Sequence, residues 1–148
     1  MNELWIILIS ALPVVELRGA IPLALGVFSF SPLKAFLLSI IGNLLLIPLL
    51  LLFLNKFSGY LMSHNNYIRK FLIWIFKRTR LRHSKNFEVL GSLALFSFTA
   101  IPLPFTGAWS ACVAAFVFGI DTGKAILFIS LGVLTAGVIV LGLTMRIL

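Results

Sequence analysis

The sequence predicts an all-α integral membrane protein made of two inverted repeats joined by a basic amphipathic linker. Of its 148 residues, 61% are hydrophobic and only 11% are charged, whereas soluble domains are roughly half apolar and a quarter charged. Too few polar residues are present to cover a soluble core. The apolar segments also have the lengths of whole or half bilayers, and the same order of segments occurs twice. We therefore expect each repeat to hold a re-entrant helical hairpin followed by one transmembrane helix.

The first apolar block, residues 3–30, contains several polar or helix-breaking residues: Pro13, Glu16, Arg18, Gly19 and Pro22. As one straight helix it would measure about 40 Å, which exceeds the roughly 30 Å of bilayer hydrocarbon. Split at the break, it gives two pieces of about 18 Å that reach only the middle of the bilayer. This pattern predicts a re-entrant hairpin. One kinked or tilted transmembrane helix is the alternative, and the spacing alone does not separate the two.

Two segments are long enough to cross the bilayer uninterrupted. Residues 33–54 would form a helix of roughly 33 Å, with Ser31 as its N-cap and a kink expected at Pro48. The second span, residues 123–145, is expected to begin with Asp121 or Thr122 as its N-cap. The sequence therefore predicts two full transmembrane helices.

The polar segment between the two halves, residues 55–88, carries most of the positive charge. The net charge is +8, and eight of the twelve lysines and arginines lie between Lys56 and Lys85. The positive-inside rule places such a segment in the cytoplasm. Because no nucleic-acid-binding signature accompanies it, membrane lipids are the expected partner and nucleic acid is not.

Within this linker, apolar residues recur with the spacing of one helix face. The stripe consists of Ile68, Phe71, Leu72, Ile75 and Phe76. Arg69, Lys70, Lys77 and Arg78 flank it and would contact anionic headgroups. The pattern favours a helix lying at the membrane surface, and the alternative is a solvated basic loop.

The second broken block, residues 89–119, has no charge and is interrupted by Pro102, Pro104 and Gly107. Short matches relate it and the following span to the first half. Lys34-Ala35 and Gly42 recur as Lys124-Ala125 and Gly132, Ala11-Leu12-Pro13 as Ala100-Ile101-Pro102, and Gly19-Ala20 as Gly107-Ala108. A hairpin returns to its own side whereas a span crosses, so the second unit would enter from the opposite face, and both termini would lie outside.

Glu16 and Arg18 fall near mid-membrane, where an unpaired charge costs at least ~2.5–3.5 kcal/mol. Two positions apart, they point to different sides of a regular helix. We expect both, with the adjacent Gly19, to line a substrate or ion site. The alternative is a structural ion pair that holds the tip of the hairpin.

The second tip would place further binding groups at the same depth. Pro102 and Pro104 stop one helix, Thr106 is expected to cap the next, and Gly107 permits close approach of the backbone. Amides at a helix start favour an anionic ligand group, and Trp109 offers a stacking face. The alternative is simple helix breaking with a packed aromatic ring.

Other polar residues favour packing over chemistry. Asn43 could contact a substrate, although an interhelical hydrogen bond is the favoured interpretation. His64 and His83 have no companions at metal-ligand spacing, so we expect no metal, and no cofactor motif is present. Protease and hydrolase motifs such as HExxH and GxSxG are also missing, which argues against an enzyme.

Two blocks together carry a family resemblance: PVVELRGAIPLALG from Pro13 to Gly26, and AIPLPFTGAWSACVAAFVFG from Ala100 to Gly119. They resemble the small multidrug export protein family over nearly the whole chain, which implies drug export. Phe105 departs from the glycine expected between PLP and TG. The E-x-R element and the later proline-containing hairpin also resemble, more distantly, DedA-type membrane proteins, which implies translocation of a phosphate-bearing lipid carrier.

We expect a small transporter in the cytoplasmic membrane of a prokaryote that exports amphipathic, drug-like molecules. In one version Glu16 takes up a proton and binds a cation. In the other, Arg18 and the amides at Thr106 and Gly107 hold the phosphate of a lipid carrier. A non-transporting assembly factor is a further alternative. Because two spans and two hairpins are few to seal a path from lipid, a homodimer is expected.

Overall fold

The computed structural model describes residues 1–80 and 85–148, and every regular element in these two ranges is an α-helix. The predicted all-helical class is therefore confirmed. The helices are α1 (Asn2–Ala11), α2 (Glu16–Gly26), α3 (Pro32–His64), α4 (Asn66–Arg80), α5 (Lys85–Ala100), α6 (Ala108–Phe118) and α7 (Thr122–Ile147). Residues 81–84, which belong to the predicted linker and include His83, lie outside the described residues.

Among the described helices, α3 and α7 are the two that are long and apolar enough to cross a membrane. The side chain of Ser31 accepts a hydrogen bond from the Lys34 amide at the start of α3, and that of Asp121 does the same for Lys124 at the start of α7. Both predicted caps are thus confirmed. Together with the family match described below, these two helices identify a membrane protein.

The helix α3 is longer than the predicted span. It has 33 residues and continues past Leu54 to His64, through Lys56 and Gly59. The prediction ended the helix where hydropathy falls, but helix formation stops only at Asn65, whose backbone is extended. Charged and polar residues continue a helix readily once its apolar part is fixed by packing. The predicted span, residues 33–54, therefore forms the first part of a longer helix.

Each of the two broken apolar blocks forms two short helices. α1 and α2 have 10 and 11 residues, and α5 and α6 have 16 and 11. The first break spans residues 12–15 and the second spans residues 101–107. Pro22, by contrast, lies inside α2 and does not end it. A proline removes one backbone donor, a loss that the remaining hydrogen bonds of the helix sustain here.

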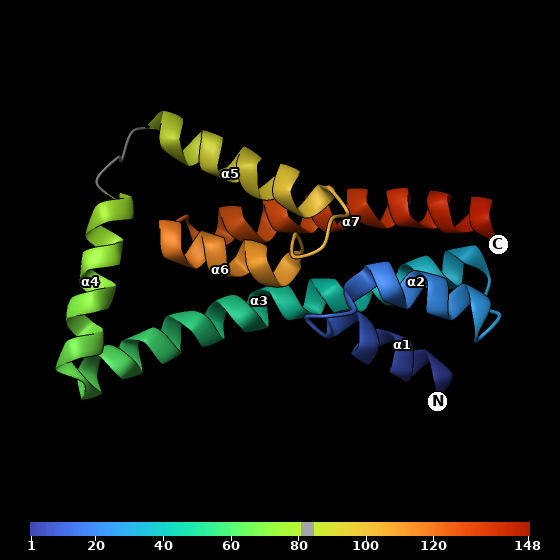
Figure 1. Ribbon diagram of the computed structural model, residues 1–148, viewed down its shortest axis with the longest axis horizontal. Coiled ribbons are helices and arrows are strands. Elements are labelled where there is room, and N and C mark those ends of the chain that lie inside the picture. The colour runs from blue at the N-terminus through green and yellow to red at the C-terminus, as the bar shows by residue number, and fades with distance from the viewer. Residues whose placement is uncertain (81–84) are drawn as a thin grey trace.

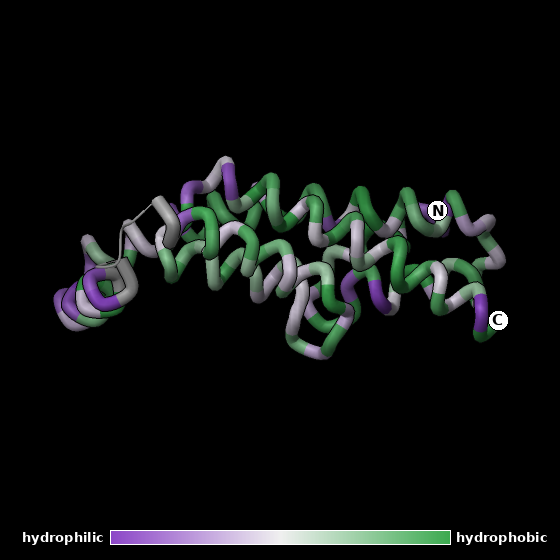
Figure 2. The backbone as a smooth tube through the Cα atoms, turned by 90° about the horizontal axis from the view of Figure 1, so that it is seen from above, coloured by the Kyte–Doolittle hydropathy of each residue, from purple (hydrophilic) through white to green (hydrophobic). Residues whose placement is uncertain are grey.

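The two helix pairs fold back on themselves and point toward each other (Figure 1). The α1–α2 pair starts from the end of the molecule where both termini lie. The α5–α6 pair starts from the opposite end, where α4 crosses the ends of the other helices. The two tips meet about halfway along α3 and α7, which pack against each other. Polar residues gather at α4 and reappear midway along an otherwise apolar body (Figure 2).

The first helix of each pair packs closely against the long helix that follows the pair. A Cβ atom on Gly42 of α3 would collide with Oγ of Ser10 in α1. A Cβ atom on Gly132 of α7 would lie 2.6 Å from Cβ of Thr99 in α5. Only glycine allows this spacing in either half. The same small-residue contact therefore joins α1 to α3 and α5 to α7.

A pair of ionic contacts repeats this correspondence at the helix ends. Nζ of Lys34 lies 2.8 Å from the carboxylate of Glu3, and Nζ of Lys124 lies 2.9 Å from that of Glu88. All four side chains are about half exposed, so solvent screens both bridges and they contribute little to stability. The two bridges occupy corresponding places in the two halves, because each one joins the first helix of a pair to the long helix that follows it.

Candidate functional site

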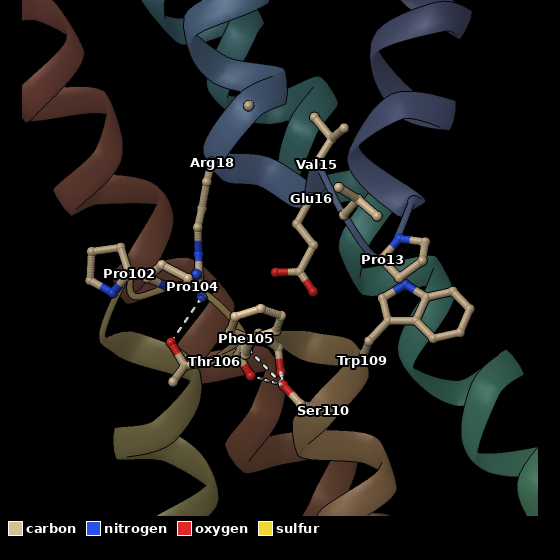
Figure 3. A pocket seen from close by; sticks show the side chains of 13 residues that line it. Pro13, Val15, Glu16, Arg18, Pro102, Pro104, Phe105, Thr106, Trp109 and Ser110 are labelled. Atoms are coloured by element: carbon tan, nitrogen blue, oxygen red, sulfur yellow. Dashed lines mark hydrogen bonds between the residues drawn. The ribbon is translucent and has the colours of Figure 1, made fainter.

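A cavity of about 680 Å³ lies where the two tips meet (Figure 3). It is lined by Pro13, Val14, Val15, Glu16, Arg18 and Gly19 of the first tip and by Pro102, Pro104, Phe105, Thr106, Gly107, Trp109 and Ser110 of the second. The structure thus brings together eight of the nine residues that the sequence nominated for a substrate or ion site. Asn43 is the exception.

Glu16 belongs to the first tip but is held by the second. It opens α2 with a positive φ of 49° and is only 7% exposed. Its carboxylate points to the start of α6 (Figure 3). A Cβ atom on Gly107 would collide with both carboxylate oxygens. Because a helix N-terminus carries partial positive charge, the start of α6 favours the carboxylate of Glu16 at this position.

Arg18 reaches across to the same loop. Its Nη2 donates a hydrogen bond to Oγ1 of Thr106 at 3.1 Å (Figure 3). No ion pair between Arg18 and Glu16 occurs in the described part of the chain. The two charged groups therefore make no direct contact, although each acts electrostatically on the other. Each one binds the opposite hairpin.

The two charges of the cavity have different surroundings. The negative charge of Glu16 faces the positive end of the α6 dipole and also acts electrostatically on Arg18. The guanidinium of Arg18 has five N–H donors, and its one hydrogen bond among the described residues is to a neutral hydroxyl. The group best able to bind a charged ligand is therefore Arg18, and the ligand it suits is an anion.

Thr106 organises the second tip in a different way from the predicted one. Its Oγ1 lies 2.7 Å from the carbonyl oxygen of Ile101 and 2.8 Å from that of Leu103, and accepts from the Leu103 amide at 3.1 Å. Gly107, and not Thr106, is the N-cap residue of α6, so the predicted cap was wrong. The hydroxyl instead satisfies carbonyls exposed where Pro102 and Pro104 break the helix.

Trp109 ties the second tip to the first helix. Its Nε1 donates to the carbonyl oxygen of Ala11, at the end of α1, over 2.9 Å. That carbonyl lies at a helix C-terminus, where intrahelical partners run out. The half-buried indole packs against the apolar core and also lines the cavity. It combines the packed aromatic and the exposed ring face, which the sequence treated as alternatives.

Asn43 lies outside the cavity. Its Nδ2 donates to the carbonyl oxygen of Ser10 at 2.8 Å and, within α3, to that of Ser39 at 3.4 Å. Asn43 is fully buried between α3 and α1. This is the interhelical hydrogen bond that the sequence favoured, so we remove Asn43 from the candidate substrate contacts.

Phe105 is the most informative residue that sequence reasoning missed. It has φ 68°, a left-handed conformation that costs a bulky residue about 1–2 kcal/mol. Glu16, 89 positions earlier, also has a positive φ. The two residues stand three positions after Pro102 and Pro13, respectively, so both tips turn at corresponding places. The signal in the sequence that could have identified Phe105 was its departure from the glycine expected between PLP and TG.

The four basic residues expected to contact lipid lie on α4, away from this cavity (Figure 1). Arg69, Lys70, Lys77 and Arg78 are exposed, and the guanidinium of Arg78 lies 5.2 Å from the centre of the Trp74 ring. Ile68, Leu72 and Ile75 of the apolar stripe are half-buried. The segment is therefore a helix, and the alternative of an irregular loop was wrong for residues 66–80.

Comparison with known families gives one match, which includes α2, all of α3, the second tip and most of α7. The family model described as "Putative small multi-drug export protein" matches residues 16–139. This confirms the resemblance carried by the two tip motifs. No curated protein and no solved structure matches the chain.

Proposed function

The chain belongs to the small multi-drug export protein family, and we propose that it is a transporter that exports small amphipathic molecules. The substrate binds in the cavity between the two tips. The observation that carries this proposal is an arginine with unused donors in a cavity midway along two membrane-length helices. Charged groups at this depth usually serve a substrate or ion pathway.

The proposed architecture consists of two inverted repeats, each a re-entrant hairpin followed by a span. Support comes from the opposite directions of the two hairpins and from the matching contacts of Gly42 and Gly132. In this arrangement the irregular backbone of both tips lines a polar cavity at mid-membrane, as backbone without regular hydrogen bonds requires in a bilayer. Discontinuous helices of this kind form the binding sites of many transporters.

We further propose that the protein lies in the cytoplasmic membrane of a prokaryote, with α4 on the cytoplasmic surface and both termini outside. The exposed basic residues of α4 would contact anionic headgroups, each worth about 1 kcal/mol near the membrane surface. A homodimer completes the proposal, because the second copy would shield the tips from lipid. The proposed function involves no chemical reaction of the substrate.

This topology has a direct test. In a Cys112→Ala background, a cysteine placed at Lys77 should react with a membrane-impermeant maleimide only from the cytoplasmic side. A cysteine at the C-terminal Leu148 should react only from the outside, because one hairpin and one span follow the linker. If both cysteines react from the same side, each broken block crosses the membrane once, as a single kinked helix, and the proposed repeats are wrong.

The geometry favours an anionic over a cationic substrate. A cation at Glu16 would have to draw the carboxylate away from the start of α6, whereas an anion finds Arg18 already facing the cavity. The lipid-carrier alternative shares this requirement, since a phosphate would use the same guanidinium. The assembly-factor alternative has no comparable observation in its favour.

Reconstituted protein would test the function. Proteoliposomes loaded with naphthalene-2-sulfonate should release it faster than protein-free liposomes with the same load. The release rate should saturate as the concentration of the probe rises. N-methylquinolinium, an aromatic cation, should leave at the rate seen in protein-free liposomes. Movement of dodecyl phosphate between leaflets without release of the sulfonate would favour the lipid-carrier alternative. If no probe moves, the transport proposal is wrong.

A further inference from the structure

The side chain of Phe105 projects from a backbone that suits glycine. Its φ of 68° lies in the left-handed region, which glycine enters without the steric cost borne by a side chain. The ring is 94% exposed, so packing within the chain does not offset that cost. A strained residue that contributes no internal packing suggests a role toward a ligand.

Hydrogen bonds on both sides impose this conformation. Oγ of Ser110 donates to the carbonyl oxygen of Phe105 at 2.7 Å and accepts from the Gly107 amide at 3.0 Å. Oγ1 of Thr106 binds the preceding loop through the carbonyl of Leu103. The loop would therefore keep this shape with glycine at position 105, and the phenyl ring is an addition to it.

The ring stands where a ligand of Arg18 would extend. Phe105 and Arg18 line the same cavity, and Val14 of the opposite tip, 91% exposed, adds a second apolar side chain. Among the described aromatic side chains, none stacks on Phe105. Figure 3 shows Phe105 in the midst of the lining residues, near the start of α6. A phenyl face is thus available beside a guanidinium.

We propose that Phe105 is a specificity-determining residue that stacks on an aromatic ring of an anionic substrate whose charged group binds Arg18. The proposal rests on the transport function proposed above and names its substrate class as aromatic anions. Val14 supplies an aliphatic contact on the other side. Stacking of two rings adds to simple apolar burial, so an aromatic anion gains over an aliphatic anion of similar size.

Binding in lipid nanodiscs would test this, with naphthalene-2-sulfonate and octane-1-sulfonate as probes and isothermal titration as the readout. The wild-type protein should prefer the naphthalene probe. Phe105→Leu should weaken binding of that probe by about 2- to 12-fold and leave the octane probe within twofold, because aliphatic burial remains. Leu103→Ala, in the same loop but outside the cavity lining, is the matched control and should bind both probes as the wild type does.

Two further variants separate the ring from the backbone. Phe105→Ala and Phe105→Gly should weaken binding of the naphthalene probe equally. The glycine variant should nevertheless melt at a higher temperature than the alanine variant, because glycine suits the left-handed backbone. Unchanged affinity in both variants would overturn the proposal. So would a loss in the alanine variant that glycine restores, because that result would assign the effect to loop geometry.

Transport measured on the same variants distinguishes this inference from the proposed function. Ring-dependent binding without release from proteoliposomes would refute transport and leave the role of Phe105 intact. Saturable release that is equal for both probes and insensitive to every Phe105 variant would refute the role of Phe105 and leave transport intact.

Discussion

Arg18→Gln should reduce transport of an aromatic anion by roughly 10- to 100-fold, since a charged hydrogen bond contributes about 1.5–3 kcal/mol. Glutamine keeps a polar group that can donate to Thr106, so the tips should stay joined and the protein should remain folded. Arg18→Lys should recover part of the activity, because it restores the charge without the paired donors of a guanidinium. Initial release rates from proteoliposomes, with melting temperature in detergent as the control, give both readouts.

Glu16→Gln should behave differently because its partner is a helix and not a ligand. Loss of the negative charge at the start of α6 should lower the free energy of unfolding by at most about 1 kcal/mol, because the lost interaction with the helix dipole is partly offset by relief of a buried charge. Since Glu16 and Arg18 also act on each other electrostatically, the costs of the two substitutions should not simply add. A coupling energy below roughly 0.5 kcal/mol in a double-mutant cycle would mean that the two charges act independently. Wild-type transport by Arg18→Gln would remove Arg18 from the site.

Gly107→Ala should lower the free energy of unfolding by about 2–4 kcal/mol, combining a steric clash with the loss of a helix cap. The new methyl group would occupy the position of the Glu16 carboxylate, and the tips would have to separate. Transport should fall with it, because the cavity is built from both tips. Unfolding in mixed micelles with increasing sodium dodecyl sulfate measures the change in stability.

A matched control and a rescue sharpen the Gly107 prediction. Gly142 of α7 has open space around its missing Cβ, so Gly142→Ala should be neutral or stabilise by up to about 1 kcal/mol. Gly107→Ala should cost less in a Glu16→Ala background, where the colliding carboxylate is gone. Equal costs in both backgrounds would mean that the close contact of Glu16 with Gly107 does not determine the stability of the tips.

The residues that form the tips could be predicted because their signals are local. Prolines and charges inside apolar blocks are visible without any partner, since each one removes a backbone donor or raises the free energy of insertion wherever it lies. Local signals did not show how far each helix continues. α3 extends to His64 beyond its apolar part, and α2 continues through Pro22, because helical residues tolerate polar side chains and a single missing hydrogen bond.

The sequence by itself determined the helical class, two membrane-length helices, the breaks in the other two apolar blocks and the nomination of Glu16 and Arg18. Only the tertiary structure decided what those charges bind. The hydrogen-bond partner of Arg18 is 88 positions away in the chain, and the carboxylate of Glu16 lies against Gly107 of the other hairpin. The cost of burying a charge is a property of one residue, whereas its compensation depends on which groups the fold brings within hydrogen-bonding distance.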